Sequence, residues 1–350
     1  MDITNVLMIV LYVLAGLAIL TILVVVHEGG HFLIGKKLGF GIVEFGVGFG
    51  PKLFSKVRKG IRYSLRAFPV GGFVQFVGED DNDSDPKAFN NQPAWKRLLT
   101  IFAGPFMNVI CALVLTMAVL LSFGDTAPYI MEVQENTPAC EAGIIAGDRI
   151  AGINGKTIDF YSELSLKSNE GIFTANGDFV SLTVERDGEL LSYEIPFNEN
   201  EDGTKTIGIL YGGARRHFGF FEAISLSFKW MYLLIVETIK ALGLMFFKGQ
   251  GTQDLMGPVG TVMYIGKATV YYGFEVALRL ASMISINLAV INLLPFPGLD
   301  GGRMMFLGIE KITGNRVPKN IEGIINFAGL VLLLILIVVL TVQDVTRGLV

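Results

Sequence analysis

The sequence predicts an α-helical polytopic membrane protein with four transmembrane helices, a membrane-associated β-sheet after the first helix and an inserted β-rich domain. Charged residues make up 17% of the chain, against about 25% in soluble domains. Four apolar stretches with at most one charged residue each, 6–26, 98–123, 276–296 and 324–342, are long enough to cross a bilayer. The stretch between the second and third has the composition of a soluble domain.

The first span, within segment 1–43, continues as a helix through the sequence His27-Glu28-Gly-Gly-His31. Residues four apart lie one turn apart on the same helix face, so His27 and His31 can bind one metal ion. Glu28 lies beside them and can reach a water molecule without binding the metal. Ionisable groups at this depth are costly and by default functional. The alternative is two core histidines and a buried acid without chemistry.

The loop that follows, 44–97, is predicted to lie on the cytoplasmic side. Eleven Lys or Arg fall between Lys36 and Arg97, and the positive-inside rule places such a loop in the cytoplasm. Residues 61–68 alternate apolar and polar, which predicts a strand, and the Gly- and aromatic-rich stretches 44–51 and 69–77 are extended. We expect a small sheet that touches lipid, with an ordinary cytoplasmic hairpin as the alternative.

The second span, 98–123, contains Gly104-Pro105 and Asn108. Its amide could face a cavity, or the helix could simply be kinked. Segment 124–200 carries Asn154-Gly155 and Asp187-Gly188 as hairpin turns and a short helix over 138–143. We therefore expect a compact β-rich domain outside the cytoplasm.

Segment 201–270 is predicted to hold an amphipathic helix at the membrane surface and a linker. The charged residues of 218–247 fall on one narrow stripe of the helix, which favours a position in the interface plane. The third span, in segment 271–350, then enters from outside and brings Asp300 to the depth of His27 and His31. Both termini are expected outside and the active site near the cytoplasmic side.

A catalytic zinc takes three protein ligands and leaves one position open. The only other histidine is His217, in a soluble linker, so the third ligand should be a carboxylate. Asp300 is best placed by depth, although it could instead cap a helix. Glu28 is then the general base. Asn292, in a loop made rigid by Pro295 and Pro297, could hydrogen-bond the substrate backbone.

Several motifs together resemble the site-2 proteases, in the bacterial branch of the regulator of sigma-E protease, whose members carry an extracytoplasmic PDZ domain. The motifs are His27-Glu28-x-x-His31, Phe49-Gly50-Pro51, Pro69-x-Gly-Gly-Phe73, Gly104-Pro105-x-x-Asn108, the segment 138–150, and Asn292-x-x-Pro295-x-Pro297-x-x-Asp300. The resemblance implies a Zn²⁺-dependent intramembrane endopeptidase in the cytoplasmic membrane and a single PDZ domain over 124–200, where some relatives have two.

By the same resemblance, the substrates are single-span proteins, either anti-sigma factors already trimmed by a site-1 protease or remnant signal peptides. Asn287 matches a position linked to substrate handling, and Asn108 joins Asn292, Pro295 and Pro297 as an expected substrate contact. The sheet over 44–77 would re-enter the membrane and hold an unwound substrate by strand addition.

The sequence supports two other classes of function, a metal transporter and an inactive PDZ adaptor, less well than it supports a protease. A metal transporter would favour ionisable ligands at several depths, whereas here they gather at one level. An inactive PDZ adaptor would be expected to carry a degraded His-Glu-x-x-His motif, and this one is intact. The formal net charge of −4 gives no indication of a nucleic-acid partner.

Overall fold

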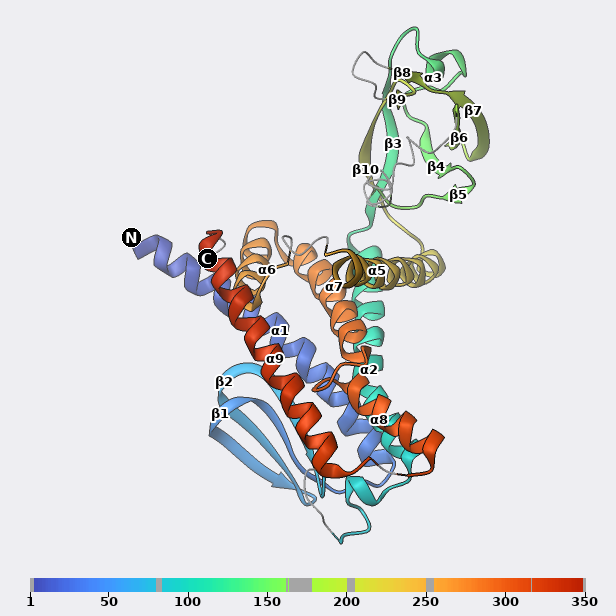
Figure 1. Ribbon diagram of the computed structural model, residues 1–350. Helices are drawn as coiled ribbons and strands as arrows, with labels where there is room; N and C mark the ends of the chain where they lie inside the picture. The colour runs from blue at the N-terminus through green and yellow to red at the C-terminus, as the bar shows by residue number, and fades with distance from the viewer. Residues whose placement is uncertain are drawn as a thin grey trace. The chain divides into compact units, whose positions relative to one another are not determined.

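The computed structural model describes residues 3–79, 84–161, 163, 178–199, 205–249, 255–315 and 317–348 (Figure 1). Two compact units are present, a helical unit made of Met1–Met117 with Ser227–Val350 and a β-rich unit made of Ala118–Leu226. The β-rich unit is thus an insertion between two parts of the helical unit.

Four helices of the described residues are long and apolar enough to cross a membrane, in agreement with the four predicted spans. They are α1 (Ile3–Lys37), α2 (Ala94–Ser122), α7 (Phe274–Leu293) and α9 (Lys319–Thr346). The predicted surface helix is α5 (Phe220–Lys248), which is not among these four. Two shorter helices, α6 (Pro258–Tyr272) and α8 (Asp300–Thr313), and the 3-10 turn η1 (Phe89–Asn91) complete the helical unit.

Glycines let the helices of this unit pack closely. A Cβ at Gly16 of α1 would lie 2.2 Å from the carbonyl oxygen of Val262, and one at Gly266 of α6 would lie 1.8 Å from that of Tyr12. Lipid supplies no hydrophobic driving force between helices, so the close van der Waals packing that small residues allow holds such crossings together. The start of α6 is held by the buried Asp344 of α9, which accepts the backbone N–H of Gly257 at 2.9 Å and of Gly260 at 2.7 Å.

The predicted sheet after the first helix is formed by β1 (Ile42–Arg58) and β2 (Ile61–Phe76). The first part of β1 pairs with both halves of β2, so that Phe45 is opposite Val74 and also opposite Tyr63, whereas the second part pairs only with the first half of β2. The last residues of β2 therefore form one edge of the sheet, and β2 lies against α1 (Figure 1). A cluster of buried apolar side chains joins the sheet to α2 and α8: Phe40, Ile42, Ile61, Phe76, Phe89, Ile101 and Leu307.

The β-rich unit is one six-stranded sheet in the order β10-β3-β4-β6-β7, with β5 paired to β4. Its strands are β3 (Asp125–Val133), β4 (Arg149–Ile153), β5 (Lys156–Thr157), β6 (Phe179–Arg186), β7 (Glu189–Pro196) and β10 (Ile209–Arg216); β8 (Asn198–Glu199) and β9 (Lys205–Thr206) form a separate pair, and α3 spans Pro138–Glu141. Fully buried Ile, Val, Leu and Ala side chains form its core.

Both predicted hairpin turns of this unit are confirmed. Asn154 and Gly155 have φ of 49° and 74°, and Asp187 and Gly188 have φ of 52° and 84°, as two-residue turns require. One strand of the six-stranded sheet, β10, lies beyond the predicted boundary at residue 200 and pairs with β3 along its length. Its sequence contains Gly-Gly and lacks a clear alternation, so only the pairing identifies it as part of the sheet.

Candidate metal centre

His27 and His31 lie one turn apart on α1, and both are buried, with 7% and 8% of their surface exposed. Their Nε2 atoms are 3.2 Å apart. A nitrogen lone pair from each ring thus points to one common position, as the four-residue spacing predicts.

Asp300 is the third member of this cluster. Its Oδ2 lies 3.1 Å from Nε2 of His27 and 3.3 Å from Nε2 of His31. Two corners of a tetrahedral zinc site with bonds of about 2.0–2.1 Å are about 3.3–3.4 Å apart. The same Oδ2 atom is buried and has no hydrogen-bond partner of acceptable geometry. The three atoms therefore fit a zinc ion, and no other such trio of potential ligands occurs among the residues that the structure describes.

The loop before α8 holds Asp300 in this position. A Cβ at Gly301 would lie 2.1 Å from the carbonyl oxygen of Leu294, and one at Gly302 would lie 2.3 Å from that of Phe296, so the loop can fold tightly only because both residues are glycine. Asp300 is the first residue of α8, and the N-terminus of this helix has no side-chain cap. The carboxylate therefore faces the imidazoles and does not cap the helix.

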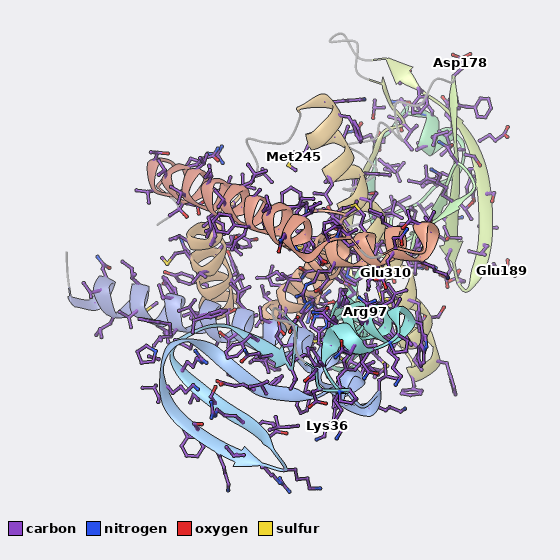
Figure 2. All side chains as sticks on the ribbon, turned by 60° about the horizontal axis from the view of Figure 1, so that its bottom comes forward. Lys36, Arg97, Asp178, Glu189, Met245 and Glu310 are labelled. Carbon is purple, nitrogen blue, oxygen red and sulfur yellow. The ribbon has the colours of Figure 1, made fainter. Side chains whose placement is uncertain are left out.

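A buried ion pair fastens α8 to α2. Arg97 of α2 is 6% exposed, and its Nη2 donates to both carboxylate oxygens of Glu310 at 2.7 and 2.8 Å (Figure 2). Removing one partner of a buried pair leaves an uncompensated charge, which costs several kcal/mol. The helix that carries Asp300 is thus tied to the helix that packs behind the histidines.

The crossing of α1 and α2 depends on two glycines. A Cβ at Gly30 would lie 2.2 Å from the carbonyl oxygen of Ala103, and one at Gly104 would lie 2.3 Å from Nε2 of His31 and 2.9 Å from Nε2 of His27. Gly104 therefore provides the space that the two imidazole rings occupy. The sequence indicated Gly104-Pro105 only as an interruption of the second span.

Two groups of α2 hold the other ring nitrogens of the histidines. Nδ1 of His31 lies 2.8 Å from the carbonyl oxygen of Thr100 and donates to it, which leaves Nε2 free for a metal. Nδ1 of His27 lies 3.3 Å from Nδ2 of Asn108, whose Oδ1 is buried without a partner. For Nε2 of His27 to bind a metal, Nδ1 must carry the proton, and the Asn108 amide turned by 180° places its Oδ1 to accept that proton.

Asn108 therefore does not take the place expected for it. Its side chain is 0% exposed and lies against His27, and it does not line the cavity beside Glu28. The sequence suggested that it faces a cavity, and the structure instead places it behind the metal centre. Among the residues that orient the ligands, Thr100 was missed because its backbone carbonyl, and not its side chain, makes the contact.

Glu28 is half-buried beside the cluster. It lines a cavity together with His31, Asp300, Phe73 and Val74, and its Oε2 accepts the backbone N–H of Val74 at 3.2 Å. The last part of β2 therefore lies directly beside the proposed base. A water molecule in this cavity would lie beside Glu28 and two of the candidate ligands, His31 and Asp300.

The remaining predicted site residues lie further along the chain. Asn292 is half-buried at the end of α7, and Pro295 and Pro297 lie in the loop that leads to Asp300, the first exposed and the second half-buried. Oδ1 of Asn287 accepts the hydroxyl of Thr238 of α5 at 2.8 Å. The structure thus gives Asn287 a partner within the protein and does not bring it to the metal centre.

Comparisons with known proteins agree over nearly the whole chain. The model of peptidase family M50 matches residues 15–336. A candidate zinc metalloprotease of Clostridium acetobutylicum is 34% identical over 340 residues, which cover 93% of this chain and 94% of the relative. The zinc metalloprotease RasP of Shouchella clausii is 30% identical over 417 residues, which cover 95% of this chain and 98% of the relative.

A solved structure matches only part of the chain. The PDZ domain of an SdrC-like protein of Listeria innocua is 26% identical, covers 26% of this chain and 99% of its own, and has a TM-score of 0.21.

Proposed function

The chain belongs to peptidase family M50 and is a zinc metalloprotease, and on this premise we propose that it cleaves single-span membrane proteins within the bilayer. The observation that carries the proposal is the convergence of His27, His31 and Asp300 at 3.1–3.3 Å. The two histidines lie on a helix long and apolar enough to span a membrane. A metal site on a membrane-spanning helix lies where it can reach the transmembrane segment of a substrate.

The residues of the site divide the work. His27, His31 and Asp300 would hold the zinc ion, and a zinc ion bound there would supply Lewis-acid chemistry toward the scissile carbonyl and a lowered pKa of water, toward about 7. Glu28 takes a proton from the attacking water on its carboxylate and passes it to the leaving amine nitrogen. The N–H of Val74 fixes the orientation of the Glu28 carboxylate.

The edge of the β1–β2 sheet supports a mode of substrate binding. A peptide bond inside a helix is already hydrogen-bonded and shielded, so the substrate must unwind before it is cut. The last residues of β2, Gly72–Phe76, form an edge beside Glu28, and an extended substrate segment can add there as a further strand. Asn292, Pro295 and Pro297 then contact the substrate from the side of the Asp300 loop.

We place the active site near the cytoplasmic face of the cytoplasmic membrane. Lys36 and Lys37 end α1 one to two turns after His31, and the loop that follows is rich in Lys and Arg. Both termini and the β-rich unit, as a PDZ domain, would then lie outside. The proposed substrates are anti-sigma factors already cut by another protease, or remnant signal peptides, and no nucleic acid takes part.

The test uses the full chain, reconstituted in liposomes with a single-span model substrate. In Glu28→Gln we expect cleavage to fall by about 10²- to 10⁴-fold, with zinc still near one ion per chain. Asp300→Ala should lose the zinc. His217→Ala, which changes an exposed histidine of the β-rich unit, is the matched control and should keep both.

Normal cleavage by Glu28→Gln would show that this carboxylate is not the base. Zinc retained by Asp300→Ala would remove Asp300 from the ligand set. If the protein cleaved only soluble peptides, the proposal of cleavage within the bilayer would be wrong, and the assignment as a zinc metalloprotease would still stand.

A further inference from the structure

A cleft lined by positive charge lies where α1 ends and the β1–β2 sheet turns back. Its lining residues are Lys36, Phe54, Lys56, Arg58, Lys59 and Tyr63. Four of the six are cations, and the lining contains no carboxylate. Among the residues that the structure describes, none of these four cations has an ion-pair partner. Within the described part of the chain, the cleft therefore has a net positive charge that no carboxylate neutralises.

Strand geometry explains why the charges gather here. Lys56 and Arg58 are two residues apart in β1, so their side chains leave the same face of the sheet. Tyr63 of β2 pairs directly with Lys56 and shares this face. Lys59, with φ of 53°, forms the turn into β2, and Lys36 (Figure 2) comes from the C-terminal end of α1.

The other cations of the sheet are used differently. Lys52 and Arg66 lie 3.1 Å and 2.8 Å from the carboxylate of Glu44, and Arg62 lies 3.7 Å from it. Glu44 is 3% exposed, so this cluster is an internal ion-pair network. The comparison separates three cations that pair with Glu44 from four exposed cations that have no ion-pair partner among the described residues.

The opposite end of the sheet is apolar and exposed. Phe49, Leu53 and Phe68 are 51%, 69% and 61% exposed. The hydroxyl of Thr21, in the middle of α1, donates to the carbonyl of Pro69 at this end. The apolar end of the sheet thus lies level with the apolar body of α1, and the cationic cleft lies level with the lysines at the end of α1.

We propose that this cleft binds the headgroup of an anionic phospholipid, with the acyl chains lying along the exposed apolar side chains of the sheet. A negative phosphate complements the four cations, and Phe54, which is 64% exposed and lines the cleft, connects the cationic end to the apolar end. A free phosphate would use the charges and leave this apolar surface in water. The proposal depends on a membrane location of α1 and not on proteolysis.

The experiment measures lipid binding to the full-length, delipidated protein by native mass spectrometry, with palmitoyl-oleoyl phosphatidylglycerol and phosphatidylcholine as probes. The variant Lys56→Gln/Arg58→Gln/Lys59→Gln removes three charges of the cleft. The matched control Lys248→Gln/Lys267→Gln/Lys311→Gln removes three exposed charges elsewhere. The zinc content of each variant reports that the helical unit is folded.

We expect the unchanged protein and the control to prefer phosphatidylglycerol, and the cleft variant to bind it at least tenfold more weakly, since each cation near an anionic headgroup contributes about fivefold. Phe54→Ser should weaken phosphatidylglycerol binding but not binding of soluble glycerophosphate. Equal phosphatidylglycerol binding by the cleft variant and the control would overturn the proposal. So would displacement of the lipid by millimolar inorganic phosphate, which would make the cleft a site for a free anion.

Discussion

The metal centre and the β-rich unit both bring polar groups into contact, but the interacting residues are separated by very different distances in the sequence. In the β-rich unit, β6 and β7 pair across a two-residue turn, so the partners are a few residues apart. In the metal centre, Asp300 meets His27 and His31 across more than two thirds of the chain. Local pairing depends on the conformation of the turn, whereas the metal centre depends on how closely three helices can approach.

Glycine shows this difference most clearly. Gly188 is needed for its positive φ of 84°, and a Cβ there would meet open space. Gly104 is needed because a Cβ would overlap the imidazole of His31. The same residue type is thus a conformational requirement in one region and a spatial requirement in the other, and the two should respond differently to substitution.

The largest effect is expected for Gly104→Ala. Its Cβ would have to lie 2.3 Å from Nε2 of His31, so the imidazole ring must leave its position. Zinc affinity should then fall by more than about 100-fold, which exceeds the usual effect of removing a residue that only hydrogen-bonds a metal ligand. Zinc content and a competition titration with a chelator measure this. The control is Gly29→Ala on α1, where a Cβ meets nothing within 4 Å. Equal zinc affinity in both variants would contradict the role assigned to Gly104.

Asn108→Leu should have the next largest effect. Without an acceptor for its Nδ1 proton, His27 loses its orientation, and removal of such partners typically costs about 10- to 100-fold in metal affinity. Asn108→Asp keeps an oxygen at this position and should restore most of the affinity. If the aspartate variant bound zinc as weakly as the leucine variant, the amide would donate to His27 and the proposed orientation would be reversed.

In the β-rich unit, we expect the stability to depend on pH through the Asp148–Arg186 ion pair. Burial raises the pKa of the Asp148 carboxyl, but the Arg186 guanidinium, 2.7 Å away, holds it below its usual range. The stabilisation is complete above the ordinary pKa of about 3.9 and is lost as the pH falls from there toward the folded value. Hydrogen exchange of β4 and β6 in the full chain, corrected for the intrinsic pH dependence of exchange, should show less protection at pH 3.5 than at pH 6. Asp148→Asn should weaken protection at pH 6 and abolish this difference.

Gly188→Ala should have the smallest effect. A left-handed conformation costs a non-glycine residue about 1 kcal/mol, and nothing obstructs the added methyl group. Exchange at the β6–β7 hairpin should become faster by about fivefold, with zinc affinity unchanged. A loss of zinc in this variant would show that the two units are coupled, against the distinction drawn between them.

Much of the fold follows from local patterns. The apolar runs predict the helices α1, α2, α7 and α9, and Asp187-Gly188 predicts the hairpin of β6 and β7, because both signals involve neighbouring residues. The strand β10 was not predicted, since it is defined by pairing with β3, some eighty residues earlier in the chain. The division of β1 and β2 into a sheet of four paired segments is also a result of pairing and not of periodicity.

By itself, the sequence determined that His27 and His31 share one face of a helix, because four residues are about one turn of an α-helix. It also predicted that Asp300 lies level with the two histidines, because the lengths of apolar helices set where their ends lie. Only the tertiary structure decided that Gly104 makes room for the imidazoles and that Asn108 faces His27. Those contacts depend on the rotation and distance of packed helices, which residues far apart in the chain set together.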